Sequence, residues 1–188
     1  MKGRRFGVVT LVSTAVIGAA IVVGYHAGLR LNFTDSAPHG LWFVQSPSLG
    51  DVKRGVLVEV CPPDLPVVRL MAERGYLAVG DCKGTGVTTL LKPVSAVAGD
   101  TIQLDQGRGV LVNDVPLPNT AAMPAIPGWP SGRYVVKPGE IWMFSSYSPG
   151  SFDSRYFGPV SLSLVKGLAR PIAISGDPAA ITTGVVKQ

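Results

Sequence analysis

Histidine and cysteine are scarce in this chain of 188 residues, which contains only His26, His39, Cys61 and Cys82. In number these four side chains could bind zinc, but none of them has the close paired spacing of structural zinc sites. Neither cysteine lies in a recognisable nucleophile motif, which argues against a cysteine protease that uses one of the histidines. The sequence therefore predicts no metal site, and we expect no cofactor.

Beyond a short basic segment at residues 1–5, clusters of basic residues are also lacking. The net charge of +5 is spread over the whole sequence, and no basic stripe alternates with aromatic residues. Because electrostatic recognition of nucleic acid depends on such clustering, we expect no nucleic-acid partner. The spread charge fits a weak attraction to the anionic lipids of a bilayer.

Charged residues are absent from residues 6–25, which follow a basic segment at residues 1–5. As a helix, this run spans about 30 Å at about 1.5 Å per residue, which is the thickness of the hydrocarbon core of a bilayer. The basic segment stays in the cytoplasm, so the chain from residue 26 onward lies across the membrane. We favour a retained anchor. The alternative is a cleaved signal peptide, because Gly18, Ala19, Ala20 and Ala27 offer small residues of the kind that a cleavage site needs.

Cys61 and Cys82 fall on the exported side of the predicted anchor, where disulfides persist. We therefore expect a disulfide between them. It would close a loop of about 20 residues and stabilise the fold by about 3 kcal/mol in the chain-entropy model.

Beyond the anchor the chain is predicted to form one mainly β domain over residues 26–176, followed by a flexible tail at residues 177–188. Runs rich in β-branched residues, bounded by glycine and proline, predict strands. The predicted strands cover residues 41–44, 54–60, 88–97, 101–104, 109–112, 132–136 and 141–144, with a last strand near residue 160. No internal repeats or heptads are present.

One short helix is expected beyond the anchor. Asp64 can cap it, the apolar residues from Leu65 to Met71 share one side of it, and Gly75 would end it. The five prolines within residues 115–130 predict an ordered connection without regular structure. The resulting fold class is mainly β with one short helix.

Lys92 is the single charge in the apolar run 88–97. One interpretation is an edge-strand lysine that discourages aggregation, since Pro93 cannot donate a ladder hydrogen bond. The other is a desolvated lysine, whose lowered pKa would let it act as a base. The run alone does not decide between them.

Ser36 lies in the segment 32–40, whose proline, glycine and small polar residues favour a turn. Such a turn is by default an ordinary surface loop. It becomes a candidate nucleophile turn if the chain supplies a base, because a serine hydroxyl is a weak nucleophile by itself.

Three motifs resemble those of a known family of proteins and occur in the same order along the chain. They are residues 34–38 around Ser36, Lys92 followed by Ala98-Gly99-Asp100, and the ten residues from Ser151 to Val160. Together they resemble the signal peptidase I family of serine–lysine proteases. The pattern Asn-x-Thr-x-Ser-x-Pro-x-Gly at residues 32–40, the small size and the single anchor are similar to its TraF-type conjugative transfer peptidases. Pro93, where the family usually has arginine, and a final motif without the Gly-Asp-Asn-Arg lead-in depart from ordinary signal peptidases.

The resemblance implies a signal-peptidase-like mixed β fold and a role for each matching residue. Ser36 would be the nucleophile and Lys92 its general base, with the Thr34 hydroxyl and the Ser36 amide stabilising the oxyanion. Ser151 would orient the lysine. Asp153 would complete the catalytic set.

Arg155 would support the site together with Asp153; an ordinary surface ion pair is the alternative for these two residues. Substrate would lie extended beside a strand, with shallow pockets lined by Phe33, Leu41 and Trp42.

The implied function is that of a serine endopeptidase in the bacterial inner membrane facing the periplasm, or in the periplasm if the anchor is cleaved. It would process and cyclise a membrane-held pilin precursor, in company with other components of the conjugative transfer apparatus. Two alternatives remain: a general signal peptidase that releases exported preproteins, and an inert anchored scaffold of the pilus apparatus. An inert domain would have no reason to hold the Lys92 amine within hydrogen-bond reach of Ser36.

Overall fold

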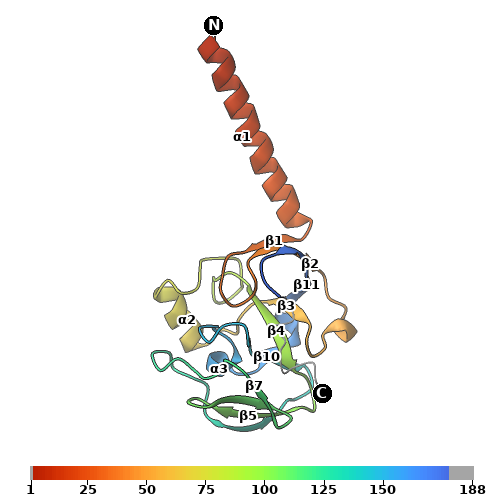
Figure 1. Cartoon of the computed structure of the whole chain (residues 1–188), viewed down its shortest axis with the longest axis vertical. Helices are drawn as coiled ribbons and strands as arrows, with labels where there is room; N and C mark the ends of the chain where they lie inside the picture. Colours follow the sequence, from red (N-terminus) through yellow and green to blue (C-terminus); the bar gives the residue numbers. More distant parts are fainter. Residues whose placement is uncertain (1, 178–188) are drawn as a thin grey trace.

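A long N-terminal helix projects from a body built mainly of strands (Figure 1). The computed structural model describes residues 2–177, and its first element is helix α1 (Lys2–His26). The segment Phe6–His26 is long and apolar enough to cross a membrane, and its apolar window is not buried against the rest of the protein. The expectation of an N-terminal apolar helix that can span a bilayer is therefore confirmed.

Seven strands form the larger antiparallel sheet, in the order β1-β2-β11-β3-β4-β9-β10. Their bounds are β1 Leu29–Asn32, β2 Gly40–Gln45, β3 Leu57–Val60, β4 Leu90–Ala96, β9 Glu140–Met143, β10 Val160–Ser161 and β11 Val165–Ile174. Two residues separate the end of α1 from strand β1, so this sheet starts at the end of that helix (Figure 1).

Four strands form the second sheet, in the order β7-β6-β5-β8, at the end of the body opposite α1 (Figure 1). Their bounds are β5 Thr101–Asp105, β6 Gly109–Val112, β7 Val115–Leu117 and β8 Gly132–Val135. The other elements are α2 Pro66–Glu73, α3 Ser154–Phe157 and the 3₁₀ turns Leu49–Asp51 and Leu162–Leu164. The prediction of a mainly β fold with few helices is confirmed.

Two apolar cores explain why the sheets hold these positions. In β5 the residues alternate between buried and half-buried, which is the pattern of a strand with one face on a core. That face packs with Trp142 and Phe144 from β9 and the residue after it. The larger core joins the central strands to α2 and to the segment around Phe157.

The position of Lys92 in the sheet decides between the two interpretations of this residue. Its strand β4 is not an edge strand, because it pairs with β3 on one side and β9 on the other, and Pro93 lies opposite Leu57. The Lys92 side chain is 2% exposed. The edge-strand interpretation is therefore wrong, and the alternative of a desolvated lysine describes this residue.

Helix α2 forms where it was expected but begins differently. Asp64 does not cap it: Leu65 occupies the N-cap position without a side-chain hydrogen bond, and Pro66 starts the helix with its fixed φ. The Asp64 carboxylate instead accepts two hydrogen bonds of 2.8 Å from Arg69. Gly75, at φ +70, follows the C-terminal end of the helix as predicted.

Strand β7 and helix α3 were not predicted. The connection at residues 115–130 is not wholly irregular, because it contains strand β7. A second helix, α3, is only four residues long and is capped by Asp153, which accepts a hydrogen bond from the Arg155 amide. The predicted tail at residues 177–188 lies outside the described residues except for Asp177.

A disulfide joins Cys61 at the end of β3 to Cys82, with 5.5 Å between the Cα atoms. Both cysteines are almost fully buried. Replacing both by alanine is expected to lower the free energy of unfolding by about 3 kcal/mol, because the unfolded chain regains the freedom of the closed loop. Urea denaturation measures this loss.

Reductant provides the control for this prediction. It should destabilise the wild-type protein by a similar amount and leave the alanine variant unchanged. Two free thiols in non-reducing mass analysis of the purified protein would contradict the expected bridge.

Candidate active site

The Asn32 side chain shapes the turn that presents Ser36 between β1 and β2. Its amide nitrogen lies 3.1, 2.9 and 3.1 Å from the carbonyl oxygens of Thr34, Ala37 and Pro38. Its oxygen accepts hydrogen bonds from the amide and the hydroxyl of Thr34 at 3.2 and 2.8 Å. One side chain thus bonds four backbone groups of the turn, which explains why asparagine begins the motif.

Gly40 ends the same motif for a steric reason. Its φ is +134, and a Cβ atom there would lie 2.2 Å from the carbonyl oxygen of Ala173 in β11. No L side chain can be accommodated so close to a backbone oxygen. Trp42 also supports the turn, because its ring N–H donates to the Pro38 carbonyl at 3.2 Å.

The Ser36 hydroxyl lies 3.1 Å from the Thr34 hydroxyl oxygen. The single hydroxyl proton of Thr34 is already directed to Asn32, so Ser36 is the donor in this pair. In this state the Ser36 proton points to Thr34, and the Thr34 hydroxyl proton is not available to an oxyanion. Both hydroxyls must rotate before they can take the roles that the family resemblance gives them.

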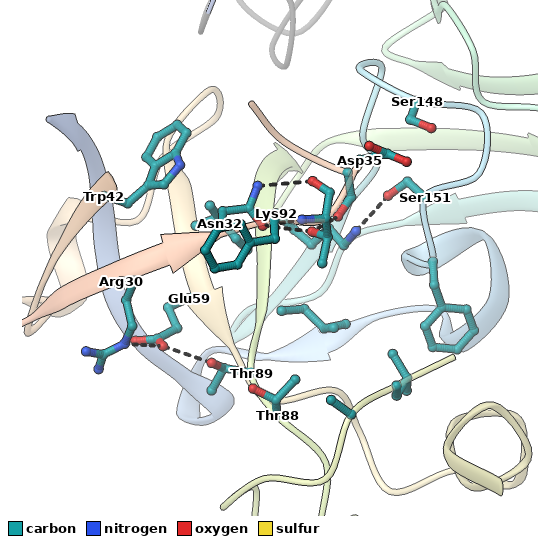
Figure 2. Close-up of a pocket in the computed structure, with 18 of the residues that line it drawn as sticks. Arg30, Asn32, Asp35, Trp42, Glu59, Thr88, Thr89, Lys92, Ser148 and Ser151 are labelled. Carbon is teal, nitrogen blue, oxygen red and sulfur yellow. Dashed lines mark hydrogen bonds and ion pairs between the residues drawn. The ribbon is translucent and has the colours of Figure 1, made fainter. Parts of the chain in front are cut away.

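Lys92 is held on the other side of the site by Ser151, whose hydroxyl oxygen accepts a 2.7 Å hydrogen bond from the amine (Figure 2). Burial lowers the pKa of Lys92 from 10.5 to about 8; the Asp153 carboxylate opposes this change and the Arg155 guanidinium adds to it. At pH 7 a pKa of about 8 leaves roughly a tenth of the lysine neutral, about 300 times the fraction at the ordinary pKa. Lys92 is therefore suited to accept a proton near neutral pH.

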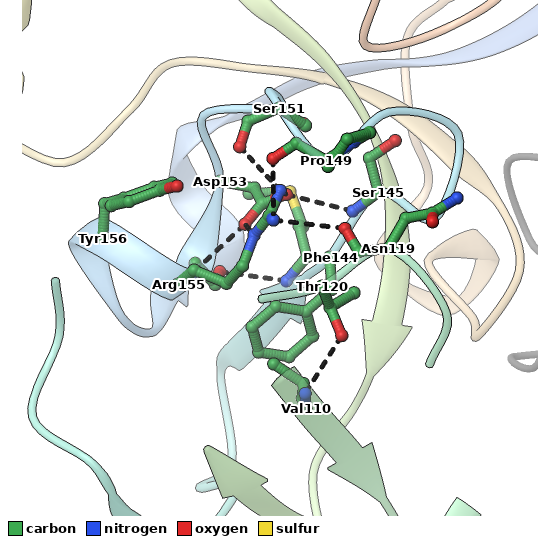
Figure 3. A network of polar contacts seen from close by, with 12 residues as sticks. Val110, Asn119, Thr120, Phe144, Ser145, Pro149, Ser151, Asp153, Arg155 and Tyr156 are labelled. Atoms are coloured by element: carbon green, nitrogen blue, oxygen red, sulfur yellow. Dashed lines mark hydrogen bonds and ion pairs between the residues drawn. The ribbon is translucent and has the colours of Figure 1, made fainter. Parts of the chain in front are cut away.

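Asp153 and Arg155 form a fully buried ion pair, 0% and 1% exposed, which rules out the alternative of a surface pair. The guanidinium contacts both carboxylate oxygens at 2.8 and 2.9 Å (Figure 3). It also donates to four backbone carbonyls, those of Asn119, Ala121, Pro149 and Ser151. A buried pair of charges is stabilised only when its remaining hydrogen-bonding groups are satisfied in this way.

A cavity of about 490 Å³ is lined by both Ser36 and Lys92. Figure 2 shows this cavity, with Lys92 and Ser151 labelled. Of the three expected substrate contacts, Phe33 and Trp42 line the cavity and Leu41 does not. Phe33 is 75% exposed, so it is open to a ligand. The far side of the cavity carries Arg30, Thr88, Thr89 and Glu59, with Glu59 accepting hydrogen bonds from Arg30 and Thr89.

The structure brings Ser36 and Lys92 into one cavity without joining them. Among the residues that the structure describes, no hydrogen bond links the Lys92 amine to the Ser36 hydroxyl. The amine bonds Ser151 instead, and the Ser36 hydroxyl bonds Thr34. The direct contact expected of a serine–lysine pair is thus not present in this state. Catalytic hydrogen bonds often tighten only when substrate binds.

Ser145 is a residue of the site that the sequence did not reveal. It follows β9, is fully buried, and donates its hydroxyl to the Ser36 carbonyl oxygen at 2.8 Å. No motif in the sequence marks this residue, because it lies six residues before the final motif begins at Ser151. Within the described part of the chain, no three His, Cys, Asp or Glu side chains lie close enough together to hold a metal ion.

Comparison with known proteins gives three findings. The family model described as signal peptidase, peptidase S26, matches residues 4–174. A plasmid transfer protein TraF of Escherichia coli is 37% identical over 178 residues, 92% of this chain and 96% of that protein. A conjugal transfer protein TraF of Agrobacterium tumefaciens is 39% identical over 164 residues, 85% of this chain and 88% of that protein.

Among solved structures, a signal peptidase I from Enterococcus faecalis is similar over 66% of this chain and 97% of its own. Its sequence identity is 16% and its TM-score is 0.36. A similarity of this size supports no statement about the site.

Proposed function

This chain belongs to the signal peptidase family, peptidase S26, together with the TraF conjugal transfer proteins, and on that premise we propose that it is a membrane-anchored serine endopeptidase. Ser36 is its nucleophile and Lys92 its general base. The observation that carries the proposal is the buried Lys92 amine, held by Ser151 in the cavity that Ser36 also lines. A desolvated lysine with a lowered pKa and a specific hydrogen-bond partner in a cavity is typical of a functional site.

The reaction proceeds through an acyl-enzyme. Neutral Lys92 accepts the Ser36 hydroxyl proton as the serine oxygen attacks a peptide carbonyl carbon. The Ser36 amide and the Thr34 hydroxyl donate to the oxyanion once Thr34 has released Asn32. Collapse of the tetrahedral intermediate breaks the peptide bond, and the lysine ammonium gives its proton to the leaving amine. Water or a second amine then attacks the ester and releases the acyl group from Ser36.

The proposed substrate is a membrane-held pilin precursor of the conjugative apparatus. Two relatives carry the names of plasmid and conjugal transfer proteins. Ser36 lies only ten residues after His26, where the apolar helix ends, so a bilayer-spanning α1 would hold the site close to the membrane surface. A protease in that position meets substrates that are themselves anchored, with the cleaved bond just outside the bilayer.

The deciding experiment is mass analysis of the plasmid's pilin from cells with the wild-type chain, without it, and with Ser36→Ala. We expect mature pilin only with the wild type. A product lighter by one water than the linear fragment indicates that the pilin's own amine attacks the ester, and a linear product indicates hydrolysis. Normal pilin maturation with Ser36→Ala would refute the peptidase and favour the alternative of an inert scaffold. Cleavage of many unrelated preproteins by the wild type would favour a general signal peptidase.

The pH dependence of cleavage tests the role of Lys92. The active form of the base is neutral, so kcat/KM should rise about tenfold per pH unit below pH 8 and level off above it, reporting the pKa of about 8 in the free enzyme. The assay is initial-rate cleavage of a pilin-derived peptide from pH 6 to 9. A rate that is flat over this range would show that no group with a pKa near 8 acts as the base.

A further inference from the structure

The buried pair of Asp153 and Arg155 is connected to the general base through one hydrogen-bonded path. Arg155 donates to the carbonyl oxygen of Ser151 at 2.6 Å, and the hydroxyl of Ser151 accepts from the Lys92 amine at 2.7 Å. Since Asp153 and Arg155 are fixed by their mutual contacts and by α3, this path sets where the lysine amine lies.

A second path leads from the same ion pair to the nucleophile. The Ser145 amide donates to the Asp153 carboxylate at 3.0 Å, and the Ser145 hydroxyl donates to the Ser36 carbonyl oxygen at 2.8 Å. Ser145 and Asp153 are both shown in Figure 3 among the groups around Arg155. This is the contact by which the Ser36 turn, 109 residues away in the chain, is tied to the ion pair.

We propose that Ser145 is a positioning residue that sets the place of the nucleophile relative to its base, an inference that rests on the proposed serine–lysine function. Ser36 and Lys92 share no direct hydrogen bond among the described residues, so their separation depends on what each is attached to. Both are attached, by separate paths, to one buried ion pair. Ser145 is the only side chain in the path to Ser36, and it acts on the backbone of the nucleophile rather than on the reacting atoms.

Ser95 offers a matched control for the loss of a buried hydroxyl. Like Ser145 it is fully buried, and its hydroxyl bonds two backbone groups, the carbonyl and the amide of Phe144, at 3.0 and 2.9 Å. The Ser145 hydroxyl likewise bonds two, the Ser36 carbonyl and the Tyr147 amide. Ser145→Ala and Ser95→Ala therefore remove similar hydrogen bonds around the same Phe144–Ser145 peptide group, but only the first removes the bond to the Ser36 turn.

The first measurement is cleavage of a pilin-derived peptide by the full-length protein in detergent. Ser145→Ala should lower kcat by about 10- to 100-fold, the effect of displacing a reacting group by about 1 Å. KM should change less than about twofold, and the pKa that limits the acid side of the pH profile should stay at the wild-type value, because the path to Lys92 is intact. Ser145→Thr keeps the hydroxyl donor and should recover most of the rate. Ser95→Ala should keep nearly the wild-type kcat.

The second measurement, hydrogen–deuterium exchange, does not depend on catalysis. In Ser145→Ala, exchange in peptides that cover residues 33–41 should be about tenfold faster than in the wild type, and in Ser95→Ala it should be unchanged there. Equal exchange in the two variants, or a kcat for Ser145→Ala within about twofold of that for Ser95→Ala, would overturn the proposal. A wild-type protein that cleaves neither this peptide nor a membrane-held precursor would refute the proposed function instead, while exchange would still show whether Ser145 holds the turn.

Discussion

Replacing Ser36 by alanine, or Lys92 by methionine, is expected to reduce peptide cleavage by at least about 10³-fold while the protein stays folded. Alanine removes the attacking oxygen, and methionine removes the base while nearly filling its space. Because both groups act in the same step, the double variant should lose little more than either single variant. Cleavage of a membrane-held precursor by purified protein in lipid vesicles measures the effect.

Stability provides the control for this prediction. The fall of the Lys92 pKa from 10.5 to about 8 means that holding the ammonium form in the folded protein costs about 3 kcal/mol at pH 7. Because the folded-state pKa is the lower one, this cost is present in full below pH 8 and fades as the pH rises toward 10.5. Lys92→Met removes it, so the variant should melt at the same temperature as the wild type or higher. Appreciable cleavage by Ser36→Ala would contradict the mechanism. A Lys92→Met protein less stable than the wild type would show that the lysine has a structural role.

Local patterns in the sequence predicted those strands whose residues alternate or are bounded by clear turns, such as the hairpin of β5 and β6. Strand β11 was missed because Gly167 and Pro171 interrupt its apolar residues. The strand exists because β2 and β3 flank it on both sides. Its pairing with β3 ends at Ala169, so Pro171 lies where no ladder bond to β3 is needed.

The motifs in the sequence located the groups of the site but not the contacts between them. Ser36, Lys92 and Ser151 were found by residue type and by their order in the chain. That the Thr34 hydroxyl proton is directed to Asn32, and that Ser145 bonds the Ser36 backbone, depends on how distant segments pack. The edge-strand interpretation of Lys92 failed for the same reason, because strand order in a sheet is a tertiary property.

The buried ion pair gives the largest expected effect on stability. Arg155→Met leaves the Asp153 carboxylate without its counter-charge and also leaves four backbone carbonyls without their donor. We expect the free energy of unfolding to fall by about 3–5 kcal/mol, the range for a buried pair that loses one partner. Urea denaturation measures the loss, and the unfolding midpoint should shift far below that of the wild type.

The pair of Arg69 and Asp64 is the matched comparison, because it is also an arginine–aspartate ion pair but is exposed to solvent. Its two hydrogen bonds are 2.8 Å long, but the side chains are 62% and 39% exposed. Arg69→Met should therefore cost less than about 1 kcal/mol, and high salt should shrink that cost further. Any Arg155→Met protein that remains folded should also cleave poorly, since the path from Arg155 through Ser151 to the lysine is lost. If the two arginine variants lose equal stability, or if folded Arg155→Met cleaves at the wild-type rate, the ion pair does not hold the site together.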